Sequence, residues 1–142
     1  MIAFIVSTAL LAIAVPFVLY PLLLWVRATW AEDPIATAEF EPCVDLIICA
    51  HDEAAAIGAK LDNALALDYP MRLVTIWVAS DGSTDGTVEI ARRYAEHGVR
   101  VLDLPRSGKA AALDAAVNAS NAEVLAFSDA NSMWQPGALK AL

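Results

Sequence analysis

The sequence lacks charge over its first stretch, because Met1 to Val26 contains no Asp, Glu, Lys, Arg or His. A helix over this stretch would rise about 39 Å, enough to cross a hydrocarbon core of about 30 Å. Pro16 and Pro21 would each remove one backbone hydrogen bond, and helices in lipid tolerate the resulting kink. The absence of charge therefore predicts one transmembrane helix over residues 1–27.

The same stretch lacks the features of a cleaved signal peptide, which has a basic N-terminal region and an apolar core of only about 7–15 residues. No basic side chain precedes the span, and Arg27 follows it directly. Because Lys and Arg are enriched on the cytoplasmic side of membrane helices, this asymmetry favours a location at the cell membrane with the rest of the chain cytoplasmic.

Basic residues and cysteines are scarce. The chain has 9 Lys and Arg against 17 Asp and Glu, all beyond Val26, and its net charge of −8 argues against a nucleic-acid partner. Cys43 and Cys49 have neither Cys-x-x-Cys spacing nor histidine partners for a metal site. We expect structural thiols in a reducing compartment.

Residues 28–42 lack helical and strand periodicity, so we expect a linker there and one domain over residues 43–142. In the domain, apolar strand-like runs alternate with helical patterns. The predicted strands are Val44–Ala50, Leu73–Ala79, Val99–Leu104 and Glu123–Ser128, and the predicted helices are Ala54–Leu67, Thr87–His97, Ala110–Ala119 and one opened by Pro136. Strands this apolar are buried on both faces, so the predicted fold class is α/β with a doubly wound, mostly parallel sheet.

Two common nucleotide-binding motifs are absent. A dinucleotide site needs Gly-x-Gly-x-x-Gly after the first strand, where this chain offers only Gly58. A P-loop needs a glycine five positions before its Gly-Lys pair, and Asp103 stands there before Gly108-Lys109. Any nucleotide site must therefore be of another kind.

Polar clusters follow all four predicted strands. They are His51-Asp52-Glu53, Asp81 with the residues up to Thr87, Arg106–Lys109, and Asp129–Asn131. Ligands of open α/β sheets bind outside the carboxyl ends of the strands. We therefore expect the four clusters to converge on one crevice.

These clusters also carry a resemblance to a known family. In order and spacing, Ile48–Ala54, Ala79–Thr87, Arg106–Ala116 and Ser128–Asn131 resemble the motifs of the family 2 glycosyltransferases with the GT-A fold, over residues 44–142. The resemblance implies the nucleotide-sugar-binding half of a GT-A domain. Ser80 departs from the pattern, because family members usually carry an acidic residue at that position.

The resemblance implies roles for individual residues. Asp81 would accept a hydrogen bond from uracil, with the Ala50 backbone and the Glu53 side chain flanking the base, whereas a turn and a helix cap are the structural alternative for Asp81–Asp85. Thr84 and Asp85 are expected to cap the next helix. His51 is interpreted as a loop residue without a catalytic role.

Arg106 and Lys109 would contact the diphosphate, since a cation at a helix start suits an anion, and solvated loop charges are the alternative. Asp129 and Asn131 stand in the place of the family's Asp-x-Asp motif and would hold Mg²⁺ or Mn²⁺. Asn131 supplies a neutral carbonyl where a carboxylate is usual, which lowers the expected metal affinity. A turn is the alternative for both residues.

The family's general base has no counterpart up to Leu142, so we assign no catalytic residue and expect the base beyond Leu142, in a longer enzyme. The fourth strand would then have one unpaired side, and an apolar edge of this kind favours association.

The resemblance implies an inverting glycosyltransferase that moves a sugar from a UDP-sugar to a saccharide or lipid-linked acceptor. Two alternatives stay open: a membrane-anchored nucleotide-binding or interaction module without transferase activity, and a nucleotidyltransferase. The second would normally have a Gly-rich, Arg-containing loop after the first strand, and His51–Ala56 contains neither residue.

Overall fold

The computed structural model describes residues 1–30 and 41–141 of the chain. The chain divides into two compact units, Met1–Glu39 and Phe40–Leu142. Most of the predicted linker, residues 31–40, lies outside the described residues.

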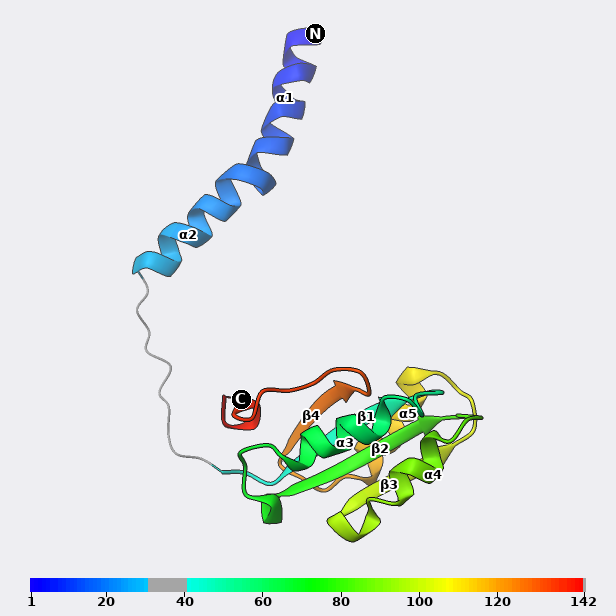
Figure 1. Ribbon diagram of the computed structural model, residues 1–142. Coiled ribbons are helices and arrows are strands. Elements are labelled where there is room, and N and C mark those ends of the chain that lie inside the picture. Colours follow the sequence, from blue (N-terminus) through cyan, green and yellow to red (C-terminus); the bar gives the residue numbers. More distant parts are fainter. Residues whose placement is uncertain (31–40, 142) are drawn as a thin grey trace. The chain divides into compact units, whose positions relative to one another are not determined.

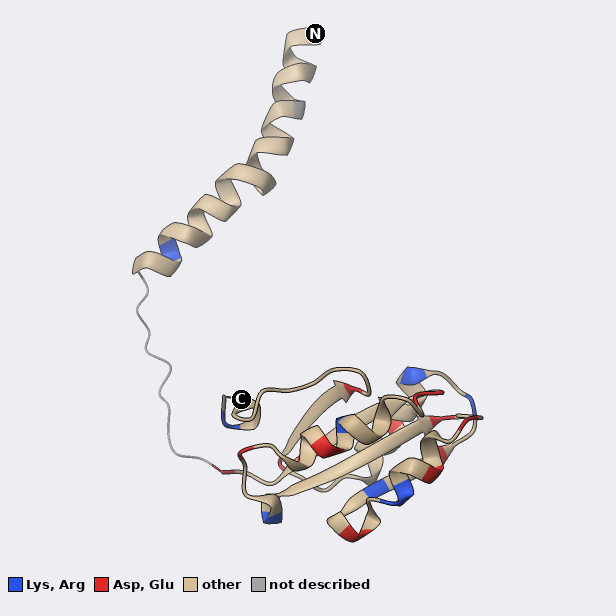
Figure 2. Cartoon of the chain, viewed as in Figure 1, with Lys and Arg blue, Asp and Glu red and all other residues tan. Residues whose placement is uncertain are grey.

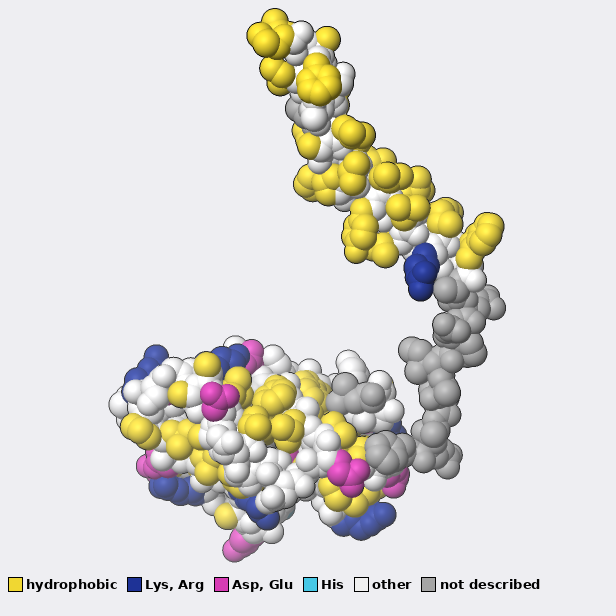
Figure 3. Space-filling view, turned by 180° about the vertical axis from the view of Figure 1, so that it is seen from behind, with side chains coloured by type: hydrophobic (Ala, Val, Ile, Leu, Met, Phe, Trp, Pro, Cys, Tyr) yellow, Lys and Arg dark blue, Asp and Glu magenta, His cyan; other side chains and the backbone are white. Residues whose placement is uncertain are grey.

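The first unit contains one apolar helix, made of α1 (Ile2–Ala14), the π-helical segment η1 (Val15–Leu19) and α2 (Tyr20–Trp30). Pro16 lies within η1 and has no N–H to donate; the Tyr20 N–H donates to the Val15 carbonyl in the wider π pattern. Hydrophobic side chains cover the helix (Figure 3), and Arg27 is its one charged residue (Figure 2). Among the described residues it is the one helix long and apolar enough to cross a membrane, a test that a signal sequence also passes.

The second unit is built on a sheet of four parallel strands in the order β3-β2-β1-β4 (Figure 1). The strands are β1 (Val44–Ala50), β2 (Val74–Asp81), β3 (Val99–Leu104) and β4 (Val124–Asp129). β1 is central, and its Ile48 lies opposite Val78 of β2 and Ser128 of β4. All four strands therefore present their carboxyl ends at the same edge of the sheet.

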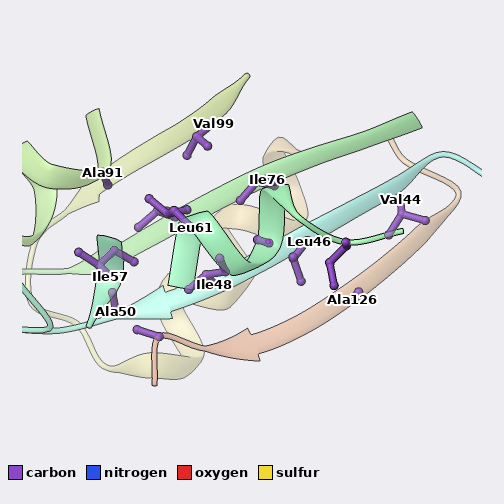
Figure 4. Close-up of a cluster of buried hydrophobic side chains, with 14 of the residues drawn as sticks. Val44, Leu46, Ile48, Ala50, Ile57, Leu61, Ile76, Ala91, Val99 and Ala126 are labelled. Carbon is purple, nitrogen blue, oxygen red and sulfur yellow. The ribbon is translucent and has the colours of Figure 1, made fainter. Parts of the chain in front are cut away.

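Helices cover both faces of this sheet. Leu46 and Ile48 of β1 belong to the cluster beneath α3 (Ile57–Leu65) and α4 (Thr87–Arg92), which Figure 4 shows. Ile47, the residue between them, belongs to the opposite cluster beneath α5 (Lys109–Ala119). The predicted doubly wound α/β class is thereby confirmed.

Several predicted helix ends differ from the observed ones. Before α3, the Glu53 carbonyl accepts the N–H groups of Ala56 and Ile57, and this turn delays the helix beyond the predicted start at Ala54. The predicted helix over Thr87–His97 splits into α4 and the 3₁₀ segment η3 (Ala95–His97), which ends at the left-handed Gly98.

Two further 3₁₀ segments complete the described part of the unit. η2 (Met71–Leu73) leads into β2, and η4 (Ala138–Ala141) replaces the helix that Pro136 was predicted to open. The Pro136 carbonyl instead accepts the N–H of Asp68 at 2.7 Å, which fastens this segment to the end of α3. The helical prediction at Pro136 was wrong because this long-range contact is not visible in local sequence.

β4 lies at one edge of the sheet formed by the described strands. Its Phe127 is 50% exposed, whereas Ala126, on the opposite face, is buried. The expectation that the fourth strand has one unpaired side is confirmed for the described residues, and Phe127 adds an exposed apolar side chain on one face of that strand.

Candidate functional site

One pocket of about 360 Å³ lies at the carboxyl ends of the strands. Every residue proposed from the sequence for the site lines it: Ala50, Glu53, Asp81, Arg106, Lys109, Asp129 and Asn131. These residues come from the ends of β1, β2 and β4, from the loops directly after β1 and β4, and from the β3–α5 connection up to the first residue of α5. The predicted convergence of the polar clusters on one crevice is therefore confirmed.

Asp81 is the last residue of β2, and its side chain is 5% exposed. Its Oδ1 accepts the backbone N–H groups of Ser107 at 2.7 Å and Gly108 at 2.9 Å, and its Oδ2 lies 3.7 Å from the Nε of Arg106. The Ser107 N–H is the main cause that holds the pKa of Asp81 below its ordinary value of 3.8. Asp81 is thus an ionised carboxylate. One of its oxygens is fixed by the loop after β3, and the other faces the guanidinium of Arg106.

Gly82 brings the loop after β2 against the loop after β3. Its φ of +63° is favourable for glycine, and a Cβ there would lie 2.6 Å from the backbone nitrogen of Arg106. The Gly82 N–H also donates to the Leu104 carbonyl at 2.8 Å. A side chain at this position would push Arg106 out of place.

The loop after β1 is fastened to the loop after β2 by Asp52. This residue has a φ of +53°, a conformation that Asp adopts more readily than most residues. Its Oδ1 accepts the Thr84 N–H at 2.7 Å, which is the main cause that lowers its pKa, and its own N–H donates to the Ser83 Oγ at 3.2 Å. Thr84 is therefore a partner of Asp52, and its predicted role as a helix cap was wrong.

Asp85 and Thr87 add a second set of bonds between the same loops. Asp85 accepts the Thr87 N–H at 2.9 Å and the Ala54 N–H at 3.0 Å, and the Thr87 hydroxyl, which also bonds Asp85, lowers the pKa of Asp85 most. The Thr87 Oγ1 accepts the Glu53 N–H at 2.8 Å. The N-cap of α4 is Gly86, so Asp85 is not the N-cap residue; its carboxylate instead accepts the N–H of Thr87, the first residue of α4, and orients the loop that carries Glu53.

His51 lines the pocket and joins the same loops. Its Nδ1 lies 2.8 Å from the Asp81 carbonyl oxygen, and its Nε2 lies 3.3 Å from Oδ2 of Asp52. The contact with Asp81 holds the end of β1 against the end of β2, and the contact with Asp52 lies within the loop after β1, so His51 has a positioning role.

Lys109 and Asp129 form an ion pair across the pocket. Lys109 is the first residue of α5, and its Nζ lies 2.5 Å from Oδ1 of Asp129 at the end of β4. The hydrogen bond to Asp129 is the main cause that raises the pKa of Lys109. Both side chains remain more than half exposed, so the pair is open to solvent and to a ligand.

The donor atoms near Asp129 fit a hard divalent cation. Asp129 offers carboxylate oxygens and Asn131 an amide oxygen, the ligand type that Mg²⁺ and Mn²⁺ take. Within the part of the chain that the structure describes, no three His, Cys, Asp or Glu side chains gather into a metal site. A cation here would need the remaining ligands from water and from a phosphate-bearing ligand.

Both cysteines are free thiols. Cys43 is exposed, and Cys49 lines the pocket from the end of β1. Burial is the main cause that raises the pKa of the Cys49 thiol, which favours its protonated form.

The sequence analysis missed Lys60, which is fully buried on α3 behind the Asp129–Asn131 segment. A signal was present, because Lys60 shares the inward face of α3 with Ile57, Leu61 and Ala64. A charged residue at a core position of a helix indicates a specific partner.

Residues 45–142 match the profile of the family described as glycosyl transferase family 2. Among curated proteins, a beta-monoglucosyldiacylglycerol synthase from Nostoc sp. is 30% identical over 96 residues. That alignment covers 64% of this chain and 20% of the relative, so the chain spans about a fifth of its length.

Two solved structures extend the comparison. A mannosyltransferase from Pyrobaculum calidifontis, in complex with GDP-Man and Mn²⁺, has a TM-score of 0.77 and 30% identity, over 94% of this chain and 41% of that chain. A glucosyl-3-phosphoglycerate synthase from Mycobacterium tuberculosis, in complex with Mn²⁺, UDP and glucosyl-3-phosphoglycerate, has a TM-score of 0.53 and 28% identity, over 70% and 37%.

Proposed function

The chain belongs to glycosyl transferase family 2, and from this premise we propose that it is the donor-binding part of a membrane-bound, inverting glycosyltransferase. The donor would be a UDP-sugar, and the acceptor a saccharide or a lipid-linked molecule. The observation that carries the proposal is that the clusters after the strands converge on one shared pocket. Family membership also removes the nucleotidyltransferase alternative.

The base-binding end of the pocket would be formed by Ala50, Glu53 and Asp81. Oδ1 of Asp81 is already engaged by two backbone N–H groups, so a base would donate its ring N–H to Oδ2. This geometry gives Asp81 two tasks, because the carboxylate that would recognise the base also fixes the loop that carries Arg106.

The diphosphate would lie toward Arg106 and Lys109, and a divalent cation held by Asp129 and Asn131 would neutralise charge on the departing nucleotide. Lys109 pairs with Asp129 in the structure. If the Asp129 oxygens were to hold a cation, the ammonium of Lys109 would be available to the phosphates. Exchange of partners within this exposed pair is easy, because surface ion pairs are weak.

The contact proposed for Asp81 suits more than one nucleotide base. Guanine and uracil both present ring N–H donors, and Oδ2 of Asp81 could accept from either. The solved relatives include one with GDP-Man and one with UDP. We choose UDP and treat preferential GDP binding as the outcome that would correct the donor while leaving the pocket in place.

We further propose that residues 1–27 span the cell membrane, that residues 28–42 link the span to a domain over residues 43–142, and that this domain is cytoplasmic. The apolar helix Ile2–Trp30, whose one charged residue is Arg27 near its end, supports the anchor and its orientation. The acceptor hydroxyl requires a general base, which we place outside this sequence because the compared proteins are longer.

The proposal is tested by calorimetric titration of the detergent-solubilised chain with UDP, and in parallel with GDP, in Mn²⁺ and in EDTA. Asp81→Asn replaces an acceptor-only carboxylate with an amide, so we expect UDP affinity to fall about 10- to 100-fold, as for the loss of a hydrogen bond to a charged group. Asp103→Asn is the matched control, because Asp103 is exposed on β3 and pairs with Arg92 outside the pocket.

Equal UDP affinity in Asp81→Asn and in the unaltered chain would contradict the proposed base contact. A second measurement separates a transferase from a binding module without activity. The full-length protein in membranes is given UDP-sugars with saccharide or lipid acceptors, and the transfer of sugar to the acceptor is measured. Nucleotide binding without any transfer to added saccharide or lipid acceptors would favour the module.

A further inference from the structure

Lys60 is a charged side chain with no exposed surface. Its Nζ donates to the Ser132 carbonyl at 2.5 Å and lies 5.2 Å from the centre of the Trp134 ring. Removing an ammonium group from water is unfavourable unless the group is paired. A methionine would fill the same space without this penalty, so the contacts of the ammonium call for an explanation.

Asn63 lies one helical turn further along α3 and holds the same segment. Its Nδ2 donates to the Trp134 carbonyl at 3.0 Å, and its Oδ1 accepts the Trp134 N–H at 2.8 Å. Both backbone groups of Trp134 are thereby satisfied by one side chain. Lys60 and Asn63, together named the α3 clamp, fix two positions of a segment that belongs to neither a helix nor a strand.

The segment held by the clamp follows the two proposed metal ligands directly. Ser132 also donates its N–H to the Asp129 carbonyl at 3.2 Å, which closes a turn around Asn131, and Ala130 is buried in the core. Ser132 and Trp134 line a second hollow of about 380 Å³ together with Asp129 and Lys109. The α3 clamp therefore acts on the position of Asn131 relative to Asp129.

The charged group of Lys60 also interacts with Asp129. Burial lowers the pKa of Lys60, and the nearby carboxylate of Asp129 opposes that shift. Asp129 therefore interacts through its charge with the buried ammonium of Lys60, in addition to its direct contact with the exposed Lys109.

We propose that Lys60 and Asn63 are positioning residues that hold the oxygens of Asp129 and Asn131 in the arrangement that a divalent cation requires, and that they thereby set the affinity for metal-bound nucleotide. The inference rests on the proposed function. A role in general stability is the alternative, and it predicts a different outcome, because it would weaken binding with and without metal alike.

The experiment uses the full chain in detergent micelles, labelled with 5-fluorotryptophan and titrated with UDP in Mn²⁺ and in EDTA. Lys60→Met keeps the volume and removes the charge. We expect the affinity for UDP in Mn²⁺ to fall about 10-fold, a loss typical of groups that orient metal ligands, and the affinity in EDTA to stay unchanged. Lys140→Met is the matched control, because Lys140 is an exposed lysine paired with Asp68.

The fluorine spectrum separates a local effect from unfolding. The Trp134 resonance should move in Lys60→Met, whereas the resonance of Trp77, buried on the other face of the sheet, should not. Unchanged UDP affinity in Mn²⁺, or an equal loss in Mn²⁺ and EDTA, would overturn the inference. If the Trp77 resonance is lost in Lys60→Met, the titrations are repeated with Asn63→Asp, which cannot donate to the Trp134 carbonyl. The same comparison of UDP affinity in Mn²⁺ and in EDTA then tests the inference.

The titrations distinguish a wrong proposed function from a wrong positioning role. If the unaltered chain does not bind UDP with or without Mn²⁺, the proposed function is contradicted and the inference falls with it. If the unaltered chain binds UDP in Mn²⁺ and Lys60→Met binds it equally well, only the positioning role is contradicted.

Discussion

At Gly82, the absence of a side chain lets two loops of the pocket meet. Gly82→Ala should be destabilised by about 1–3 kcal/mol from the left-handed backbone alone and should also lose UDP affinity, because the new Cβ would displace the Arg106 backbone. Stability is measured by urea unfolding and affinity by calorimetry.

Gly98→Ala is the matched control for this change. Gly98 has a φ of +84°, but no atom lies within 4 Å of a Cβ built there. Its variant should therefore show the backbone destabilisation with unchanged UDP affinity. Equal UDP affinity in Gly82→Ala and Gly98→Ala would mean that the close approach at Gly82 does not shape the pocket.

The residue types predicted which side chains reach the pocket. They did not predict most of the hydrogen bonds that hold those side chains in place. Asp81 was expected to face a ligand, and its bonds to Ser107 and Gly108 were not foreseen. Thr84 was expected to cap a helix and instead binds Asp52. Such bonds join loops that are distant in sequence, so they depend on how closely the folded loops approach rather than on any local pattern.

At the scale of elements, the strands were the most predictable part. β1 and β3 have the predicted bounds, because an apolar run between polar clusters defines a buried strand at both ends. Helix ends were less predictable. α4 stops at Arg92, and beyond it the Tyr94 hydroxyl donates to the Gly58 carbonyl of α3, a tertiary contact that helical periodicity cannot reveal.

α3 contributes side chains both to the hydrophobic core and to the support of the candidate site. Ile57 and Leu61 pack beneath the sheet, and Lys60 on the same face reaches the segment after β4. The helical spacing placed Lys60 on the inward face of α3, but it could not reveal that its ammonium contacts the Ser132 carbonyl, which is distant in sequence. The pocket thus depends on elements that do not line it.

At the scale of the whole molecule, the open edge at β4 has a consequence for solution behaviour. We expect residues 43–142, produced alone, to associate at micromolar concentration, because Phe127 is 50% exposed on an edge strand. Phe127→Lys should weaken this association about tenfold or more, since burying one such side chain contributes roughly 1.5–3 kcal/mol. Sedimentation velocity measures the association.

Met71→Lys is the control for the edge, because Met71 is a 38% exposed hydrophobic residue of η2, which leads into β2. It should leave association unchanged. A monomeric domain that melts cooperatively without either substitution would count against the expectation.

The central claim is that the strand ends form one pocket for a metal-bound sugar nucleotide. Its most direct measurement is paramagnetic broadening of backbone amide resonances by Mn²⁺ with UDP, with Mg²⁺ as the diamagnetic reference. The account predicts strong broadening at Ala50, Asp81, Gly108 and Asp129. It predicts none at Arg72 or Asn121, which line a hollow at the opposite edge of the sheet, where the amino ends of the strands lie. Broadening centred on Arg72 and Asn121, or spread equally over both edges, would contradict it.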